Sequence, residues 1–200
     1  MANYNYPTDR IFIPRSIIWS FRDNARVFES QLSGAIQSTS VPGTRWACSL
    51  IFDNHLPEDR AQIEGFFSLI RRQNRIVMHR LDRPKALGTI NSGGVLLNSV
   101  LAQFGSVAVL KNCGANKLLK AGSMIGISSQ LFMTAFDAVS NSSGIMTVTL
   151  SVPSRLTHGA DTAVTLDKPT AKWMYNSNGA DFARSGQVAT PLTIDLVEVF

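Results

Sequence analysis

One segment of the chain combines two strand patterns with a helix pattern in the order strand, helix, strand. It is the stretch Ala47–Leu81, which reads ACSLIFDNHLPEDRAQIEGFFSLIRRQNRIVMHRL. Apolar residues alternate from Trp46 to Phe52 with the period of two that is typical of a strand. The β character resumes at Arg75. A helix between two strands has to cover a face or an edge of their sheet, and this requirement constrains the fold more than any other feature.

The helix in this segment is predicted over about residues 57–72. Pro57 suits the first helical position, and Glu58 and Asp59 put negative charge in the first turn, where the helix dipole favours it. Arg71 and Arg72 put positive charge at the other end. Four apolar residues share one face at helical spacing: Ile63, Phe66, Phe67 and Ile70. We expect this stripe to pack on the sheet.

The last strand of the chain, in TPLTIDLVEVF, decides the domain organisation. Leu192, Ile194 and Leu196 face one way, and the alternation then changes phase, with Val197 on the second face and Glu198 on the first. A bulge near Leu196 and Val197 would restore one apolar face, and burial of both faces near the end would also fit. A strand this apolar has to pair with the first half of the chain.

The middle of the chain differs from both ends. The Gly- and Ser-rich stretch PKALGTINSGG begins at Pro84, and the sequence after it alternates short strand patterns with turns and shows no helix period. We therefore predict a mainly β (α+β) fold with a discontinuous first domain, residues 1–86 plus 168–200. This domain is expected to be a β-sandwich with one flanking helix, at about 57–72. Residues 87–167 are expected to form an inserted small all-β domain, resembling a barrel.

Residues that carry chemistry do not form a recognisable motif. His55, His79 and His158 have no metal-ligand spacing, and the Gly-rich stretch lacks the Gly-Lys-Ser/Thr ending of a phosphate-binding loop. A G-x-S-x-G elbow is also missing from the sequence. Cys48 and Cys113 are the only cysteines, and two so far apart do not make a disulfide framework. We therefore predict no catalytic residue, no metal site, no cofactor and no enzyme activity.

The charge of the chain limits its partners. Charged residues make up 16% of the sequence, whereas about 25% is usual. Either assembly contacts or a surface rich in Ser, Thr and Asn would explain the difference. The net charge of +5 is concentrated between residues 71 and 85, but no aromatic residues interleave with that cluster as in single-strand nucleic-acid binding. The first residues, MANYNYPTDR, do not resemble a signal peptide, and we expect folding in a reducing cytoplasm.

Two stretches resemble a group of siphophage tail proteins. The first, LSGAIQSTSVPGTRWACSLIFDNHLPEDRAQIEGFFSLIRRQNR, has the turn Ser33–Ala35, the strand start Gly43–Trp46 and the helix Glu58–Arg72, which runs into an Arg-rich loop. The second comprises LLKAGSMIGISSQLF and SSGIMTVTLSVPSRLTHGADTAVTLDKPTAKW, with a Lys-Ala-Gly turn before a hairpin and a return through LDKPTAKW. The two stretches lie in the order found in that group and cover most of the chain. Within the group, the sequence is most similar to distal tail proteins.

The resemblance implies a structural virion protein of the tail tip. Distal tail proteins form a hexameric ring that joins the tail tube to the central hub, and their ring domain is a tail-tube-like β-sandwich with a helix. The implied partners are further copies of the chain, the tail tube protein, the hub or baseplate protein and the tape-measure protein. Neither a membrane nor a cofactor is implied, and DNA would only pass through the channel. The implied location is the virion tail tip, with assembly in the host cytoplasm.

Other functions remain open at the level of the sequence. A minor tail or tail-completion protein is one alternative, and a receptor- or saccharide-binding module of the tail tip is another. For a ring, we predict a subunit interface in which basic residues of one subunit meet acidic residues of the next. The candidate residues are Arg22, Arg71, Arg72 and Arg75 on one side and Asp53, Glu58 and Asp59 on the other. The alternative for the arginines is a solvated basic face or the lining of a channel through which DNA passes.

Overall fold

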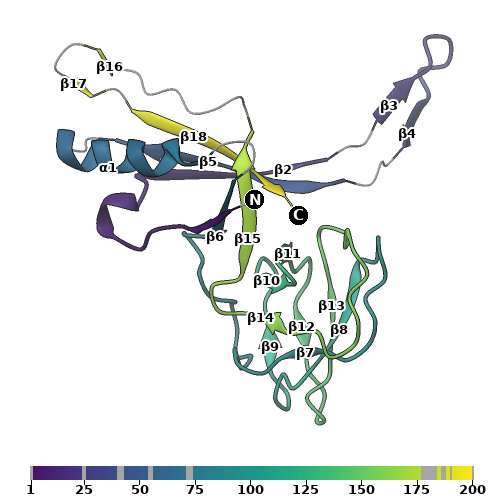
Figure 1. Cartoon of the computed structure of the whole chain (residues 1–200). Coiled ribbons are helices and arrows are strands. Elements are labelled where there is room, and N and C mark those ends of the chain that lie inside the picture. Colours follow the sequence, from purple (N-terminus) through teal and green to yellow (C-terminus); the bar gives the residue numbers. More distant parts are fainter. Residues whose placement is uncertain are drawn as a thin grey trace.

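The protein is mainly β, with a single α-helix among the residues that the structure describes (Figure 1). The computed structural model describes residues 2–23, 26–39, 43–53, 56–70, 74–176, 184–185, 188–189 and 191–199. The largest element is a six-stranded sheet, built from the two ends of the chain. Its strands, in spatial order, are β1 (Asn3–Asn5), β6 (Arg75–His79), β15 (Thr170–Tyr175), β18 (Leu192–Val199), β5 (Arg45–Phe52) and β2 (Ser16–Arg22).

The C-terminal strand β18 lies inside this sheet, between β15 and β5. It pairs antiparallel with both. Among the described strands of this sheet, β1 and β6 are the only neighbours that run parallel to each other. The pairing with β5 runs from Leu192 opposite Phe52 to Val197 opposite Ala47 without an extra residue on either strand. Of the two interpretations of the phase change, the bulge is therefore wrong. Both faces of β18 are buried from Leu196 onward.

One face of the sheet carries the first hydrophobic core. Cross-strand partners on this face include Cys48 opposite Leu196 and Leu50 opposite Ile194, and Trp173 belongs to the same cluster. Burying such apolar surface is the dominant favourable term in folding. On the other face, the Ser49 hydroxyl hydrogen-bonds the Asp195 carboxylate. The alternation seen in the sequence thus separates an apolar face from a more polar one.

The helix α1 (Pro57–Ser68) covers part of the apolar face (Figure 1). It begins at Pro57, as the sequence predicts, but it ends before the predicted end near residue 72. The Leu69 and Ile70 N–H groups donate to carbonyls of the last turn, and the Asn74 side-chain amide donates to the Leu69 carbonyl oxygen at 2.8 Å. These bonds satisfy carbonyl groups that would otherwise be left without partners, so the helix can stop there.

The predicted apolar stripe is only partly buried against the sheet. Ile63, Phe67 and Ile70 are buried, and the Tyr175 hydroxyl donates to the Phe67 carbonyl oxygen at 2.6 Å. Phe66 is half-buried and turns toward the N-terminal segment, where its ring lies 5.5 Å from that of Phe12. The prediction that Phe66 packs on the sheet is therefore corrected. The reason is that the 3₁₀ turn η1 (Arg10–Phe12) packs beside the helix and contacts Phe66.

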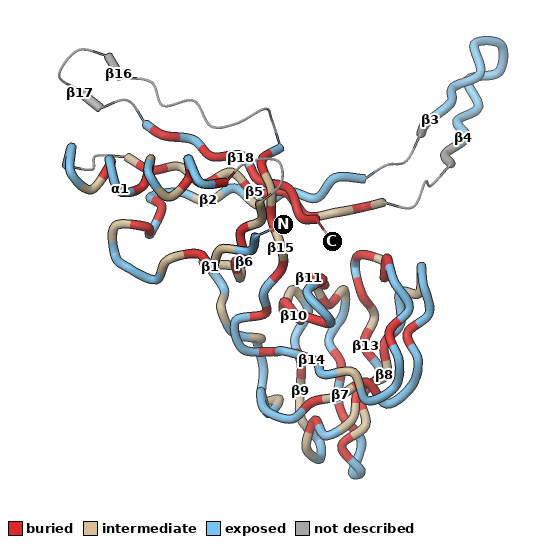
Figure 2. Tube along the Cα trace, viewed as in Figure 1, coloured by how far each residue is buried: buried red, intermediate tan, exposed pale blue. Residues whose placement is uncertain are grey.

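Residues between β6 and β15 form short strands around a second core. The strands are β7 (Leu96–Leu97), β8 (Val107–Lys111), β9 (Leu118–Leu119), β10 (Met124–Ile127), β11 (Gln130–Met133), β12 (Ala138–Val139), β13 (Met146–Thr149) and β14 (Val164–Thr165). They pair in sheets of two or three strands. The buried residues of this second core include Leu97, Leu110, Ile125 and Phe132. We call residues 87–167 the inserted module. The inserted module lies against the sheet. Figure 2 shows its buried strands β10 and β11 close to β15 of the sheet.

Two further hairpins complete the described elements. One consists of β16 (Arg184–Ser185) and β17 (Val188–Ala189). The other consists of β3 (Arg26–Glu29) and β4 (Ile36–Thr39), which follow β2 and precede β5 in the chain. This second hairpin, residues 26–39, projects away from the rest of the molecule (Figure 1), and we call it the arm.

Candidate functional site

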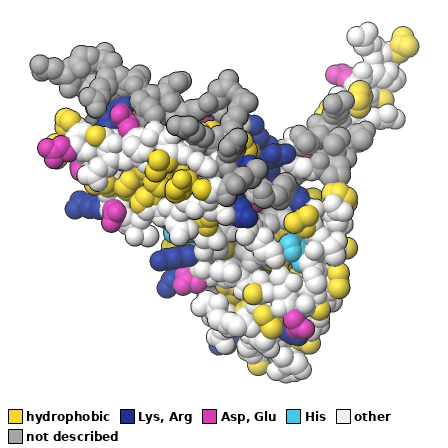
Figure 3. Space-filling model, viewed as in Figure 1, with side chains coloured by type: hydrophobic (Ala, Val, Ile, Leu, Met, Phe, Trp, Pro, Cys, Tyr) yellow, Lys and Arg dark blue, Asp and Glu magenta, His cyan; other side chains and the backbone are white. Residues whose placement is uncertain are grey.

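The arm is the most exposed apolar element among the described residues. Its turn is closed by the Ser30 N–H, which donates to the Ala35 carbonyl oxygen at 3.0 Å, and Gly34 there has φ +63. Four large apolar side chains of the arm are exposed: Val27 (65%), Phe28 (57%), Leu32 (101%) and Ile36 (68%). Figure 2 shows the arm as exposed along its described length, and Figure 3 shows hydrophobic side chains out to its tip. This projection was not predicted from the sequence.

The apolar residues of the arm lie on both of its faces. Val27 and Phe28 are neighbours in β3 and therefore point to opposite sides, and Ile36 pairs with Glu29 across the hairpin. An isolated two-stranded hairpin is marginally stable in water, because it has little to pack against. Covering the apolar side chains of the arm with another surface would therefore stabilise it. The signal in the sequence that could have predicted this hairpin is the pair of apolar runs on either side of Ser33–Ala35.

The strand β2, from which the arm continues, forms an open edge of the six-stranded sheet. It is seven residues long, and its Ile18 and Phe21 side chains are each about half exposed. A long edge strand with exposed apolar side chains presents unpaired backbone groups to a further strand. The other edge is the three-residue strand β1, which offers much less.

A groove lies at the beginning of β2, at the end opposite to the arm. Its volume is about 520 Å³. Its apolar lining residues are Tyr6, Phe12, Ile13, Pro14, Ile17 and Leu81, and its polar ones include Arg15, His79, Asp82 and Lys168. Burial lowers the pKa of His79, and the nearby Lys168 charge lowers it further. Together the arm, the β2 edge and the groove form the candidate interaction surface.

The predicted interface residues lie on different sides of this surface. Arg22 ends β2 next to the arm and is exposed, whereas Asp53 follows β5 at the other end and pairs with Arg15. Since Arg22 lies opposite Arg45 and β5 is eight residues long, roughly 26 Å separates the two ends at about 3.3 Å per residue. The structure does not bring Arg22 and Asp53 together within one subunit.

The remaining predicted residues belong to α1 and the loop after it. Glu58 and Asp59 occupy the first turn of α1, whose N-cap residue Leu56 makes no side-chain capping bond, and Glu58 is exposed. Arg75 begins β6, is half-buried, and donates from Nη1 to the Asn74 carbonyl oxygen at 3.2 Å. Three further residues discussed above, His55, Arg71 and Arg72, lie outside the described residues.

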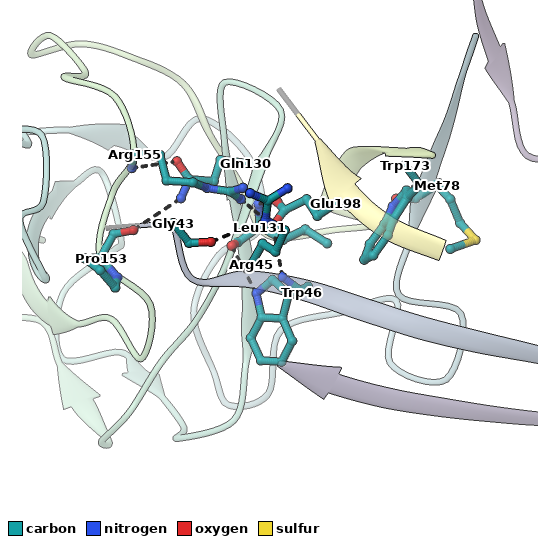
Figure 4. A network of polar contacts seen from close by, with 10 residues as sticks. All are labelled: Gly43, Arg45, Trp46, Met78, Gln130, Leu131, Pro153, Arg155, Trp173 and Glu198. Carbon is teal, nitrogen blue, oxygen red and sulfur yellow. Dashed lines mark hydrogen bonds and ion pairs between the residues drawn. The ribbon is translucent and has the colours of Figure 1, made fainter. Parts of the chain in front are cut away.

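A buried ion pair joins the inserted module to the sheet (Figure 4). The Glu198 carboxylate on β18 is 0% exposed and pairs with the Arg155 guanidinium. It also accepts hydrogen bonds from the backbone N–H groups of Leu131, at 2.9 Å, and Trp46, at 3.4 Å. The Trp46 indole N–H donates to the Leu131 carbonyl oxygen at 3.3 Å. This network explains why Glu198 interrupts an apolar strand.

Both charges of this pair are shifted by burial. Desolvation raises the pKa of Glu198 and lowers the pKa of Arg155, in each case against the attraction of the partner. A buried pair of this kind fixes geometry more than it adds stability, because removing two charges from water is costly. The pair and its hydrogen bonds thus link the inserted module to strands β5 and β18 of the sheet.

Within the described part of the chain, no group of three or more His, Cys, Asp or Glu side chains could hold a metal ion. None of the described helices has the length and apolar character needed to cross a bilayer. No protein-family model matches the chain, and a search of curated proteins finds no similar sequence.

Proposed function

We propose that the chain is a structural virion protein of a long-tailed bacteriophage. In this proposal it forms a ring at the distal tail and joins the tail tube to the tip or hub. The single observation that carries the proposal is the arm, because its exposed apolar side chains have no use in a monomer. The resemblance of the two sequence stretches to distal tail proteins supports the identity of the assembly.

The finer architecture follows from the same proposal. The six-stranded sheet with α1 would be the tail-tube-like ring domain, made of residues 1–86 and 168–200, and the inserted module would be its peripheral domain. Support comes from the strands of the sheet, which all lie in residues 3–79 and 170–199. A second layer, needed for a sandwich, would come from the inserted module and the neighbouring subunit.

The protein works by assembly in this proposal, without turnover or a cofactor. A closed ring requires a head-to-tail contact, in which different surfaces of adjacent subunits meet. The arm at one end of β2 and the groove at the other are different surfaces, which supports a contact of this kind. Partners along the tail axis would be the tube protein and the hub protein, with the tape-measure protein and DNA inside the channel.

The experiment is a measurement of mass and of location. Size-exclusion chromatography with light scattering, over a hundredfold concentration range, should yield a single oligomer with the mass of a closed ring, and negative-stain images should show that ring. Antibody labelling of purified tails should mark the distal end. A chain that stays monomeric at every concentration and is missing from purified tails would refute the proposal.

A further inference from the structure

The groove at the start of β2 has the character of a binding site for an apolar turn. Its lining includes the buried Phe12 and Tyr6, whose ring centroids lie 6.3 Å apart, and Ile13, which is 64% exposed. Its volume of about 520 Å³ is more than three times the roughly 150 Å³ of a cavity that holds one benzene ring. Several side chains would therefore fit inside.

The polar rim of the groove leaves one cation without a counterion. Arg15 pairs with Asp53, and Asp82 pairs with Arg80. Lys168 is exposed, and no ion-pair partner for it exists in the described ranges. An acidic side chain on whatever enters the groove would meet this ammonium group.

The arm carries both an exposed apolar side chain that would fit the groove and an acidic side chain that would meet Lys168. Leu32 at its turn is fully exposed, and Glu29 is its only acidic residue. The arm cannot reach the groove of its own chain, because it leaves from the end of β2 opposite to the groove and extends away from the body (Figure 1). An occupant with this chemistry therefore has to come from a second copy.

We propose that the tip of the arm of one subunit docks into the groove of the next subunit. Leu32 enters the apolar part between Phe12, Ile13 and Leu81, and Glu29 approaches Lys168. The contact joins two different surfaces, so it repeats head to tail and closes into a ring or continues as a filament. It rests on the proposed function only in that the chain assembles with itself.

Cysteine pairing tests the contact directly. Two variants are made, Leu32→Cys and Ile13→Cys, and each places a cysteine at an exposed position. The native Cys48 and Cys113 are buried and should not compete for the new thiols. Under mild oxidation, a mixture should give a disulfide-linked heterodimer that neither protein gives alone. A matched control, Val139→Cys on the inserted module, is equally exposed and should not link to Leu32→Cys. Linkage of Leu32→Cys to itself, or none to Ile13→Cys, would overturn the proposal.

Polar substitutions measure how much the contact contributes. Leu32→Gln and Ile13→Gln should each weaken self-association about tenfold or more, whereas Val139→Gln should not. Glu29→Lys should also weaken it, and Lys168→Glu should restore part of the loss in the double variant. If the wild type forms a ring that these variants leave unchanged, the docking is wrong while the ring stands. If the wild type never assembles, both proposals fail.

Discussion

Removing the charge of Arg155 is expected to destabilise the whole protein. In Arg155→Met the carboxylate of Glu198 stays 0% exposed and keeps only the N–H groups of Leu131 and Trp46. A buried charge left without its partner costs about 3–5 kcal/mol. The Arg155 side chain is itself only 7% exposed, so the pair belongs to the buried class for which this cost of losing one partner applies.

The double variant Arg155→Met with Glu198→Gln is the matched control. Its amide oxygen can still accept the Leu131 N–H, but it carries no charge. We expect the double variant to recover about 2 kcal/mol or more of the loss. Equilibrium urea unfolding measures each free energy of unfolding, followed by the fluorescence of the three tryptophans, one of which, Trp46, lies beside the pair. A loss below about 1 kcal/mol for the single variant, or a double variant as unstable as the single, would refute the reasoning.

The pH dependence gives a second check on the same pair. Burial raises the pKa of Glu198, and removing Arg155 should raise it further. A carboxyl group with a raised pKa binds more protons in the folded state than in the unfolded state, so falling pH stabilises the fold through that window. We therefore expect the stability of Arg155→Met, relative to the double variant, to rise as the pH falls from neutral toward about 4.3. A difference that does not change with pH would contradict this assignment.

Three further predictions concern the sheet, the helix and the inserted module. Phe67→Ala should cost about 3–5 kcal/mol because Phe67 is fully buried, and Phe66→Ala about 1–2 kcal/mol because Phe66 is half-buried; equal losses in urea unfolding would contradict the packing. Deleting residues 191–200 removes the strand between β15 and β5 and should abolish the near-UV circular dichroism of the tryptophans; an unchanged spectrum would show that the sheet survives without β18. Burial lowers the pKa of His158, so the stability should fall as the pH drops below about 6.5, and His158→Gln should reduce this dependence; identical pH profiles in thermal unfolding would rule out His158 as its source.

The periodic elements of this protein follow from its sequence. Alternation in β5 and β18 and the Pro57 start of α1 are local signals, since each depends on residues a few positions apart. The pairing of the last strand with the first half of the chain was also predictable, because so apolar a strand needs two neighbours. The alternation and the helix start depend on neighbouring residues, and the strand pairing depends on the apolar character of one segment, so the sequence indicates all three.

The tertiary structure alone decided the features on which the proposed function rests. Arg155 and Glu198 are 43 positions apart, and no local pattern marks a charge whose partner comes from another module. The half-burial of Phe66 depends on where the N-terminal segment packs. The arm has ordinary strand signals, and only the fold reveals that nothing else among the described residues covers it. Packing between distant segments determines which apolar residues remain exposed, and that information is spread over the whole chain.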